Sequence, residues 1–334
     1  MSRKQNTRYS GIGGQAVLEG IMMKNKDQYA VAVRKPDGEI EVEIEHYQGI
    51  LHGNKLMNVP FVRGIFQFID SLVLGMRSLN FSASFYEEED AKETIADRAF
   101  NKLFKDKAEK VFSGIVMVLS LLMAIGIFMV LPYFVTSKFE NYVRNASLLA
   151  ILEGVLRIVI FVLYILAISM MKDIRRTYQY HGAEHKCINC IEKGRPLTVK
   201  NVMRSSRLHK RCGTSFLLFV MLVSVVLFFF IRVQNPVYRV LIRIALVPVI
   251  AGISYEIIRL AGKSNNILVR IISSPGMLLQ KLTTKEPDES MVEVAIAAVE
   301  AVFDWKKYLY DTFGYEVDDS WLVDDEPQEK EEEL

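Results

Sequence analysis

The fold of this chain is decided by the stretch VFSGIVMVLSLLMAIGIFMVLPYFV, residues 111–135. No charged residue lies between Lys110 and Lys138. A helix of this length crosses the hydrocarbon core of a bilayer, which is roughly 30 Å thick, because each residue adds about 1.5 Å. We therefore expect a transmembrane helix over 111–137. Residues 212–231 form a second uncharged run, and we predict another span there.

Two further apolar segments carry charged residues. Segment 147–171 contains Glu153 and Arg157, and segment 237–262 contains four charged residues and a central proline. Ionisable groups inside a span are costly unless they pair or face a polar interior. Because Glu153 and Arg157 are four residues apart, they share one helical face and can neutralise each other. We predict that both segments span, which gives an α-helical polytopic membrane protein with about four transmembrane helices.

The distribution of charge, rather than the net charge of +2, indicates the orientation of the spans. Segment 172–212 has eleven lysines and arginines against three acidic residues, whereas the linkers 136–147 and 232–236 have three basic residues between them. Basic residues are enriched in cytoplasmic loops, so we place 172–212 in the cytoplasm. Four spans then place both termini there. A juxtamembrane position explains the basic residues, and we do not expect nucleic acid as a partner.

The regions outside the spans differ in composition. Residues 29–47 alternate apolar and polar side chains around the turn sequence KPDG, which predicts a β-hairpin. The chain divides into an N-terminal β-containing cytoplasmic region (1–54), an amphipathic or interfacial helix with a charged linker (55–110), a four-helix transmembrane domain with the basic cytoplasmic loop 172–212 (111–262), an interfacial segment followed by a cytoplasmic amphipathic helix (263–312), and an acidic tail that we expect to be disordered (313–334).

The stretch YHGAEHKCINC, residues 180–190, contains the residues that indicate chemistry. On a helix, His181 and His185 share one face, with Glu184 beside it. The string H-x-x-E-H matches the inverted zincin pattern, in which two histidines bind zinc. We therefore predict zinc, or another divalent metal, on His181 and His185, with Glu184 as the general base for a water molecule. Either His209 or Cys212 would complete the set of ligands.

A different metal site uses part of the same sequence. Cys187-x₂-Cys190 followed by His209-x₂-Cys212 is similar to a zinc ribbon, which would be a closed, structural site. The two hypotheses share His209 and Cys212, so both sites cannot be complete at once. A polar network without metal is the third alternative. Three of the five histidines and all three cysteines lie within 32 residues, which favours metal binding, with the catalytic form ahead of the structural one.

Three other residues are weaker candidates. Glu19 would serve as the catalytic base if Glu184 were itself a ligand. His46 and His52 have the ordinary explanation of surface or packing residues. The glycines of GIGGQAV, residues 11–17, predict a close approach of the backbone to another element.

Seven blocks of sequence, spread over residues 11–310, together resemble the YqhQ-like family of bacterial membrane proteins. The blocks are GGQAVLEGIMMK (13–24), PFVRG (60–64), HGAEHK (181–186), LTVKN (197–201), HKRCGTSF (209–216), SYEIIR (254–259) and EPDESMVEVA (286–295). Lys24 stands where an arginine is expected in that family. The family is a domain of unknown function labelled a predicted metal-dependent enzyme, which implies the set His181, Glu184, His185, His209 and Cys212.

The resemblance also bears on the remaining candidates. Cys187 and Cys190 lie outside the seven blocks, whereas Gly13, Gly14, Gln15 and Glu19 lie inside the first one, which implies a cytoplasmic cap over the metal site.

The sequence thus favours a zinc-dependent integral membrane enzyme, hydrolytic in type, with its site at the cytoplasmic face of the bacterial cytoplasmic membrane. The alternative is a membrane scaffold, biogenesis factor or transporter, in which a structural metal or a polar network pins the 172–212 loop. The expected partners are the lipid bilayer and an unidentified substrate, and a homo-oligomer is compatible with the sequence.

The predicted orientation can be checked by cysteine labelling in intact cells. A reagent that does not cross the membrane should modify a cysteine probe placed in 138–145 and spare one placed in 193–206, since the basic segment is expected inside. The reverse pattern of labelling would contradict the orientation and the cytoplasmic site.

Overall fold

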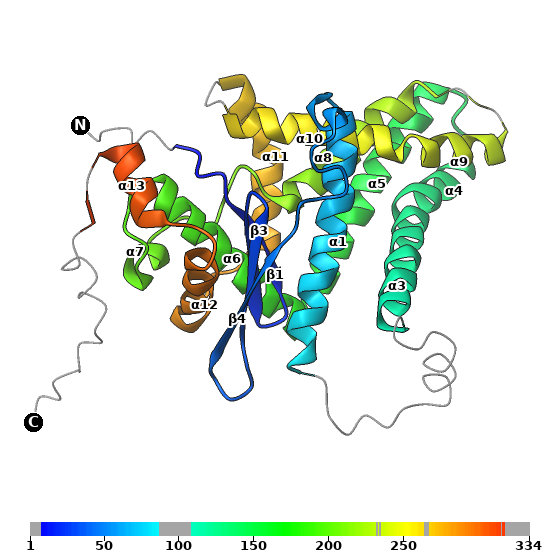
Figure 1. Ribbon diagram of the computed structural model, residues 1–334. Helices are drawn as coiled ribbons and strands as arrows, with labels where there is room; N and C mark the ends of the chain where they lie inside the picture. Colours follow the sequence, from blue (N-terminus) through cyan, green and yellow to red (C-terminus); the bar gives the residue numbers. More distant parts are fainter. Residues whose placement is uncertain are drawn as a thin grey trace, which may run out of the picture.

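The computed structural model describes residues 8–86, 108–231, 233, 235–263, 267–314 and 316–317. It shows a mostly helical protein with one small sheet formed by its N-terminal part (Figure 1). Most of the predicted charged linker and of the predicted acidic tail lies outside the described residues.

The sheet is an antiparallel meander of four strands, in the order in which they follow along the chain. The strands are β1 (Gly13–Val17), β2 (Gly20–Asn25), β3 (Gln28–Arg34) and β4 (Ile40–His46). The predicted hairpin is confirmed as β3 and β4, with Arg34 paired to Ile40 across the turn. The central strands are buried on both faces, so the sheet lies between two layers of helix.

Alternation along the strands explains these two layers. Successive side chains of a strand point to opposite faces. Ile21 and Met23 of β2 join one apolar cluster with residues of α6 (Lys172–Glu192) and α12 (Glu289–Glu300). Met22 points the other way, into a cluster with Leu74 of α1 (Val62–Ser84). The sheet thus holds α1 on one side and the α6–α12 pair on the other.

The remaining helices form the apolar part of the molecule. They are α3 (Ala108–Ile125), the π-helical turn η3 (Gly126–Val130), α4 (Leu131–Ser137), α5 (Ala146–Ile168), α8 (Gly213–Phe229), α9 (Pro236–Ala245), α10 (Val247–Lys263) and α11 (Ile267–Thr283). The short elements are η1 (Lys55–Asn58), α7 (Val199–Met203) and α13 (Trp305–Phe313).

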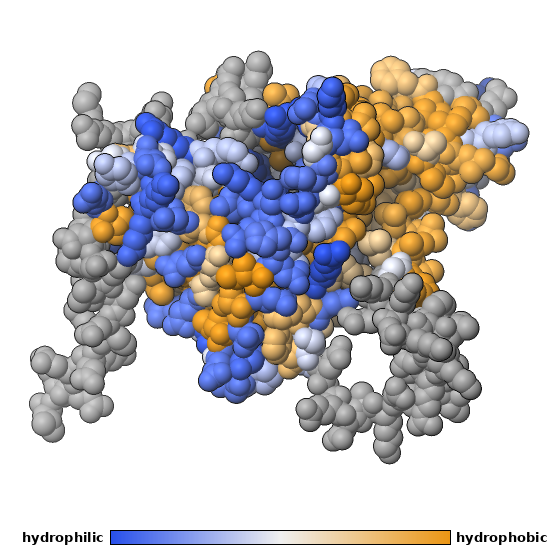
Figure 2. Space-filling model, viewed as in Figure 1, coloured by the Kyte–Doolittle hydropathy of each residue, from blue (hydrophilic) through white to orange (hydrophobic). Residues whose placement is uncertain are grey.

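Three stretches of the described residues are long and apolar enough to cross a membrane: Gly114–Ser137, Ala146–Ile168 and Val237–Leu260. The predicted span at 212–231 is a shorter apolar helix, because α8 has 17 residues and a span needs about 20. Figure 2 shows the apolar surface gathered over α3, α4, α5 and α9, while the side with the sheet and α13 is largely polar. These features indicate a membrane protein.

The last of these stretches is divided into two helices. It breaks at Leu246, and α10 then begins with Pro248 in its first turn, a position that a proline tolerates because the N–H groups there have no partner within the helix. In Figure 1, α10 runs across the upper end of α1, while α9 lies farther along, near α4. A Cβ atom on Gly64 of α1 would lie 3.0 Å from the Cα atom of Gly252. Close packing of these glycines therefore anchors the predicted amphipathic helix to the spans.

A buried cluster of charges joins the spans. The predicted pair is confirmed, because Arg157 Nη2 lies 2.7 Å from Glu153 Oε1. Arg243 of α9 joins the same carboxylate, donating from Nη2 to Glu153 Oε2 at 2.8 Å. Arg157 also donates to the carbonyl of Phe128, in η3, at 2.8 Å and to Ser224 of α8 at 3.1 Å. One glutamate thus holds two arginines, and together they connect four elements.

Two segments of the polar part differ from their predicted form. Segment 172–212, expected as a loop, is largely folded into α6 and α7. The amphipathic helix expected near the C-terminus is divided into α12 and α13, because Asp304 caps a new helix by accepting a hydrogen bond from the backbone of Lys307. The segment expected at the membrane interface is α11, which packs on α8 with Gly276 against Ser215.

The charge cluster predicts a large effect of one neutral substitution. Glu153→Gln leaves two buried arginines without their carboxylate, so we expect a loss of about 3 kcal/mol in the free energy of unfolding, measured by denaturant titration in detergent micelles. Glu140→Gln is the matched control. The Glu140 carboxylate is half exposed and lies 3.6 Å from Arg239, and such pairs contribute about 1 kcal/mol or less. Equal effects of the two variants would contradict the assigned role of Glu153.

Candidate metal centre

Helix α6 positions the central residues of the site. It begins after a break at Met171, rather than as a continuation of α5. Its C-terminal half is buried among the sheet, α7 and α12, with polar side chains among those enclosed. Buried polar groups are costly unless they are hydrogen-bonded. Each polar side chain on this half of α6 therefore needs a partner, and the partners define the site.

The two histidines of α6 are held in the same way. His181 Nδ1 lies 3.0 Å from the carbonyl oxygen of Thr283, and His185 Nδ1 lies 2.6 Å from that of Arg207. A carbonyl only accepts, so each Nδ1 carries the hydrogen, and in the neutral imidazole each Nε2 keeps a lone pair. Metal-binding histidines are commonly fixed by such a hydrogen bond from their second nitrogen.

The lone pairs of the two histidines converge on a cysteine. His181 Nε2 lies 3.1 Å from Cys212 Sγ, and one ligand atom each from His181, His185 and Cys212 can be chosen within 4.8 Å of one another. In the described part of the chain, no other three histidine, cysteine or carboxylate residues form such a group. Two imidazoles and a thiolate suit a divalent transition metal, so the side chains fit the predicted ion.

The charges of the group keep Cys212 in its metal-binding form. Burial alone would raise the pKa of the Cys212 thiol, but His181 and His185 hold it well below its usual range. Burial alone would lower the pKa of His181, yet the facing Cys212 raises it to about 9. Without a metal the cysteine is therefore stable as a thiolate, which is the form that binds metals.

Glu184 lies beside this group and is covered by the first strand. The backbone N–H of Gly14 donates to Glu184 Oε1 at 3.1 Å. A Cβ atom on Gly14 would lie 2.5 Å from the carbonyl oxygen of Met22 and 3.1 Å from Glu184 Cγ. Glycine is therefore required for this approach, as the run of glycines predicts.

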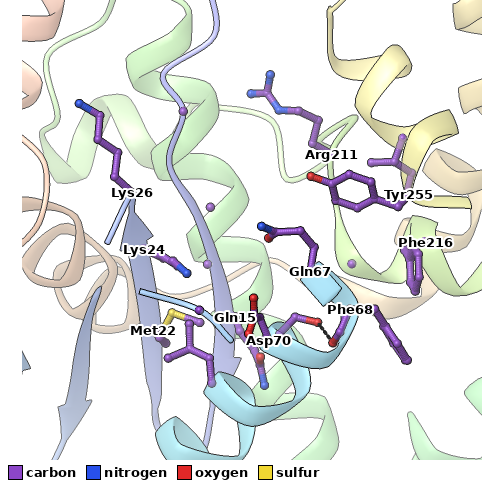
Figure 3. A pocket seen from close by; sticks show the side chains of 18 of the residues that line it. Gln15, Met22, Lys24, Lys26, Gln67, Phe68, Asp70, Arg211, Phe216 and Tyr255 are labelled. Carbon is purple, nitrogen blue, oxygen red and sulfur yellow. Dashed lines mark hydrogen bonds between the residues drawn. The ribbon is translucent and has the colours of Figure 1, made fainter. Parts of the chain in front are cut away.

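A cavity of about 690 Å³ opens beside His181, Glu184, His185 and Cys212. In Figure 3, Lys24 of β2 lies on one side, Arg211 and Tyr255 on the opposite side, and Gln67 and Asp70 of α1 between them. Gly13, Gly14 and Gln15 also line this cavity, and so does the exposed His52. The site thus has an open side, unlike a structural metal site, which is closed by its ligands.

Glu19 and His46 lie elsewhere. Glu19 sits in the turn between β1 and β2, where its carboxylate is paired with Arg176 and accepts a hydrogen bond from Tyr180. It is absent from the described lining of the cavity. His46 is exposed at the end of β4. The structure therefore pairs Glu19, the alternative base, with Arg176 outside the described lining of the cavity.

The structure also does not assemble the zinc ribbon. Cys187 and Cys190 are part of the apolar core, and Cys190 Sγ lies 3.3 Å from the carbonyl oxygen of Pro196. Burial raises the pKa of both thiols, that of Cys190 to about 12, so neither is a ready thiolate ligand. His209 stands behind His185, with Nε2 3.6 Å from Glu192. Among the described residues, Cys212 is the one that completes the histidine pair.

Several residues that position the site were not found from the sequence. Lys186 donates to the carbonyls of Met203 and Ser205 at 2.7 and 3.0 Å, and Gln280 of α11 bonds to the backbone of His209 through both its amide atoms. The sequence contains a pointer to Lys186, because this residue lies inside the HGAEHK block. No sequence pattern points to Gln280, since its partner is 71 residues away.

Comparison with known proteins finds relatives without an established function. The model of a family described as "Protein of unknown function (DUF1385)" matches residues 59–305. The "Uncharacterized protein YqhQ" of Bacillus subtilis (strain 168) is 36% identical over 289 residues, which cover 85% of this chain and 89% of that protein. No solved structure matches the chain.

The geometry predicts which variants lose a bound divalent metal. His181→Ala, His185→Ala and Cys212→Ser each remove one of the three converging atoms, so we expect metal affinity to fall by at least about tenfold. Metal content is measured by elemental analysis of detergent-purified protein. Cys190→Ala is the control and should keep the metal. Loss of metal from Cys190→Ala alone would contradict the assigned site, and absence of stoichiometric metal from the wild-type protein would contradict any metal site here.

Proposed function

Since this chain belongs to the DUF1385 family of proteins of unknown function, we propose its function from its own site: a zinc-dependent hydrolase of the bacterial cytoplasmic membrane. One observation carries the proposal. His181, His185 and Cys212 converge with both histidine Nδ1 atoms held by carbonyls, and they do so on the wall of a cavity. Catalytic zinc sites typically have three protein ligands and one open position.

The side chains have separate roles in this proposal. His181, His185 and Cys212 hold the zinc ion, which acts when bound as a Lewis acid and makes water more acidic. Glu184 takes the proton from the attacking water as its oxygen adds to the substrate, and later gives that proton to the leaving group as the bond to it breaks. The N–H group of Gly14 orients the Glu184 carboxylate.

The lining of the cavity supports a substrate with an anionic part and an apolar part. Lys24 and Arg211 supply positive charge from opposite sides (Figure 3). Burial lowers the pKa of Lys24, so an anion beside it would favour its charged form. Phe68, Phe216 and Ile258 supply an apolar wall between them.

We propose four spans, with both termini and the metal centre in the cytoplasm. Cys212 lies directly before α8, and α6 follows directly after α5, so the centre lies where two apolar helices end. The basic residues of 172–212 support the cytoplasmic side. With its flanking residues, α8 would cross a locally thin bilayer.

A scaffold or transporter is the second candidate, favoured by the charge cluster of Glu153, Arg157 and Arg243 within the apolar helices. Charged groups in spans commonly mark paths or essential contacts. In that case the metal would be structural, and Glu184 would have no catalytic role.

Glu184→Gln tests the proposal against this alternative. We expect the variant to keep its zinc and to lose about 10²-fold to 10⁴-fold in kcat, because the general base is gone. The measurement is hydrolysis of a panel of chromogenic acyl and phosphate esters with acidic and acyl-chain substituents, alongside zinc analysis. Glu293→Gln, on an exposed position of α12, is the control. A zinc-loaded wild-type protein that hydrolyses nothing in the panel faster than Glu184→Gln would contradict the enzyme and favour the second candidate.

A further inference from the structure

A second cavity lies at the other end of the apolar helices. It has a volume of about 230 Å³ and is lined by the end of α4, the start of α5, the end of α8 and part of α9. The metal centre lies at the opposite end of α8, before Gly213. The two sites are therefore separated by the length of an apolar helix, and the second one belongs to no part of the proposed reaction.

The charges around this cavity do not balance. Glu153 is shared by Arg157 and Arg243, and Glu140 faces Arg239 at 3.6 Å. Three arginines thus face two glutamates among the described residues, which leaves one positive charge. Charge without a counter-ion is costly inside an apolar region.

Arg243 brings the unbalanced positive charge to the wall of the cavity. It lines the cavity and is 5% exposed, and its Nε atom has no hydrogen-bond partner in the described part of the chain. Its guanidinium lies 5.0 Å from the ring of Tyr133 and 4.9 Å from that of Phe228. These rings stabilise a cation in part, but they accept no conventional hydrogen bond. The Nε donor of Arg243 is thus buried and unpaired in a side chain that lines the cavity.

We propose that this cavity binds a phosphate-type oxyanion, supplied by the headgroup of an anionic phospholipid in the leaflet remote from the metal centre. Guanidinium groups match phosphate oxygens in shape and charge, and Arg239 and Arg243 both line the cavity. The rest of the lining combines apolar side chains, such as Leu149 and Phe229, with the hydroxyl groups of Thr136 and Ser137 and the two glutamates already paired with these arginines. The adjoining surface of α5 and α9 exposes Leu148 and Val237. A headgroup can enter here while its acyl chains remain on the apolar helices.

The test uses the full-length protein in detergent and measures retained lipid by native mass spectrometry. Wild-type protein should retain phosphatidylglycerol in preference to phosphatidylcholine. Arg239→Gln should weaken this retention by about tenfold, since it removes one charge-assisted contact. Arg144→Gln removes an exposed charge from the same end of the molecule and should behave as wild type. Equal retention of the two lipids, or an equal loss in Arg144→Gln, overturns the proposal.

A variant that is expected to strengthen lipid binding distinguishes a loss of binding from a loss of folding. Glu140→Gln removes a negative charge from the cavity wall, so it should strengthen retention of phosphatidylglycerol; weaker retention overturns the proposal. Free phosphate is the other source of the same chemistry. If millimolar inorganic phosphate raises the thermal unfolding midpoint of the wild type but not of Arg239→Gln, while neither lipid is preferred, the oxyanion site stands and the lipid source is overturned.

Discussion

The metal centre depends on hydrogen bonds from α6 to backbone carbonyls that have no partner in a helix or strand. The connection between α7 and α8 is partly buried, and side chains of His185, Lys186 and Asn189 reach its carbonyl oxygens. A buried carbonyl without a partner is costly. The requirement fixes the course of the connection, and the connection ends at Cys212 beside the histidines. The bond to the Arg207 carbonyl determines which nitrogen of His185 is free, so one of the bonds that stabilise this connection also orients a ligand. The carbonyl of Thr283, at the end of α11, does the same for His181.

The small sheet also contributes to the metal centre. Its inner strands are enclosed by α1 and by the α6–α12 pair, so the sheet is a wedge between the apolar helices and the polar layer. Gly14, at its edge, brings a backbone N–H to Glu184. The N-terminal region therefore forms a wall of the cavity. This explains why the cavity can combine basic groups from the strands with aromatic groups from α1 and α8.

The charge cluster in the apolar helices also follows from the cost of leaving a buried polar group without a partner. Around α6, the carbonyls of the connection between α7 and α8 require donors. Among the apolar helices, the buried arginines require acceptors. Glu153, the carbonyl of Phe128 and Ser224 supply these for Arg157. Arg243 is less well supplied, because its Nε atom has no partner among the described residues. In both regions apolar packing makes the helices associate, and the hydrogen bonds of buried polar groups decide how the helices are arranged.

Features that depend on residues close together in the chain can be predicted from the sequence. Runs without charge indicate membrane helices, alternation around KPDG indicates the hairpin, and spacing of four places Glu153 beside Arg157 and His181 beside His185. Tertiary structure alone decided the rest. It chose Cys212 over His209 as the third member of the group, placed Arg243 on Glu153, and directed Glu19 away from the cavity. Each of these outcomes depends on contacts between residues far apart in the chain, and local periodicity carries no information about which distant backbone or charge a side chain will meet.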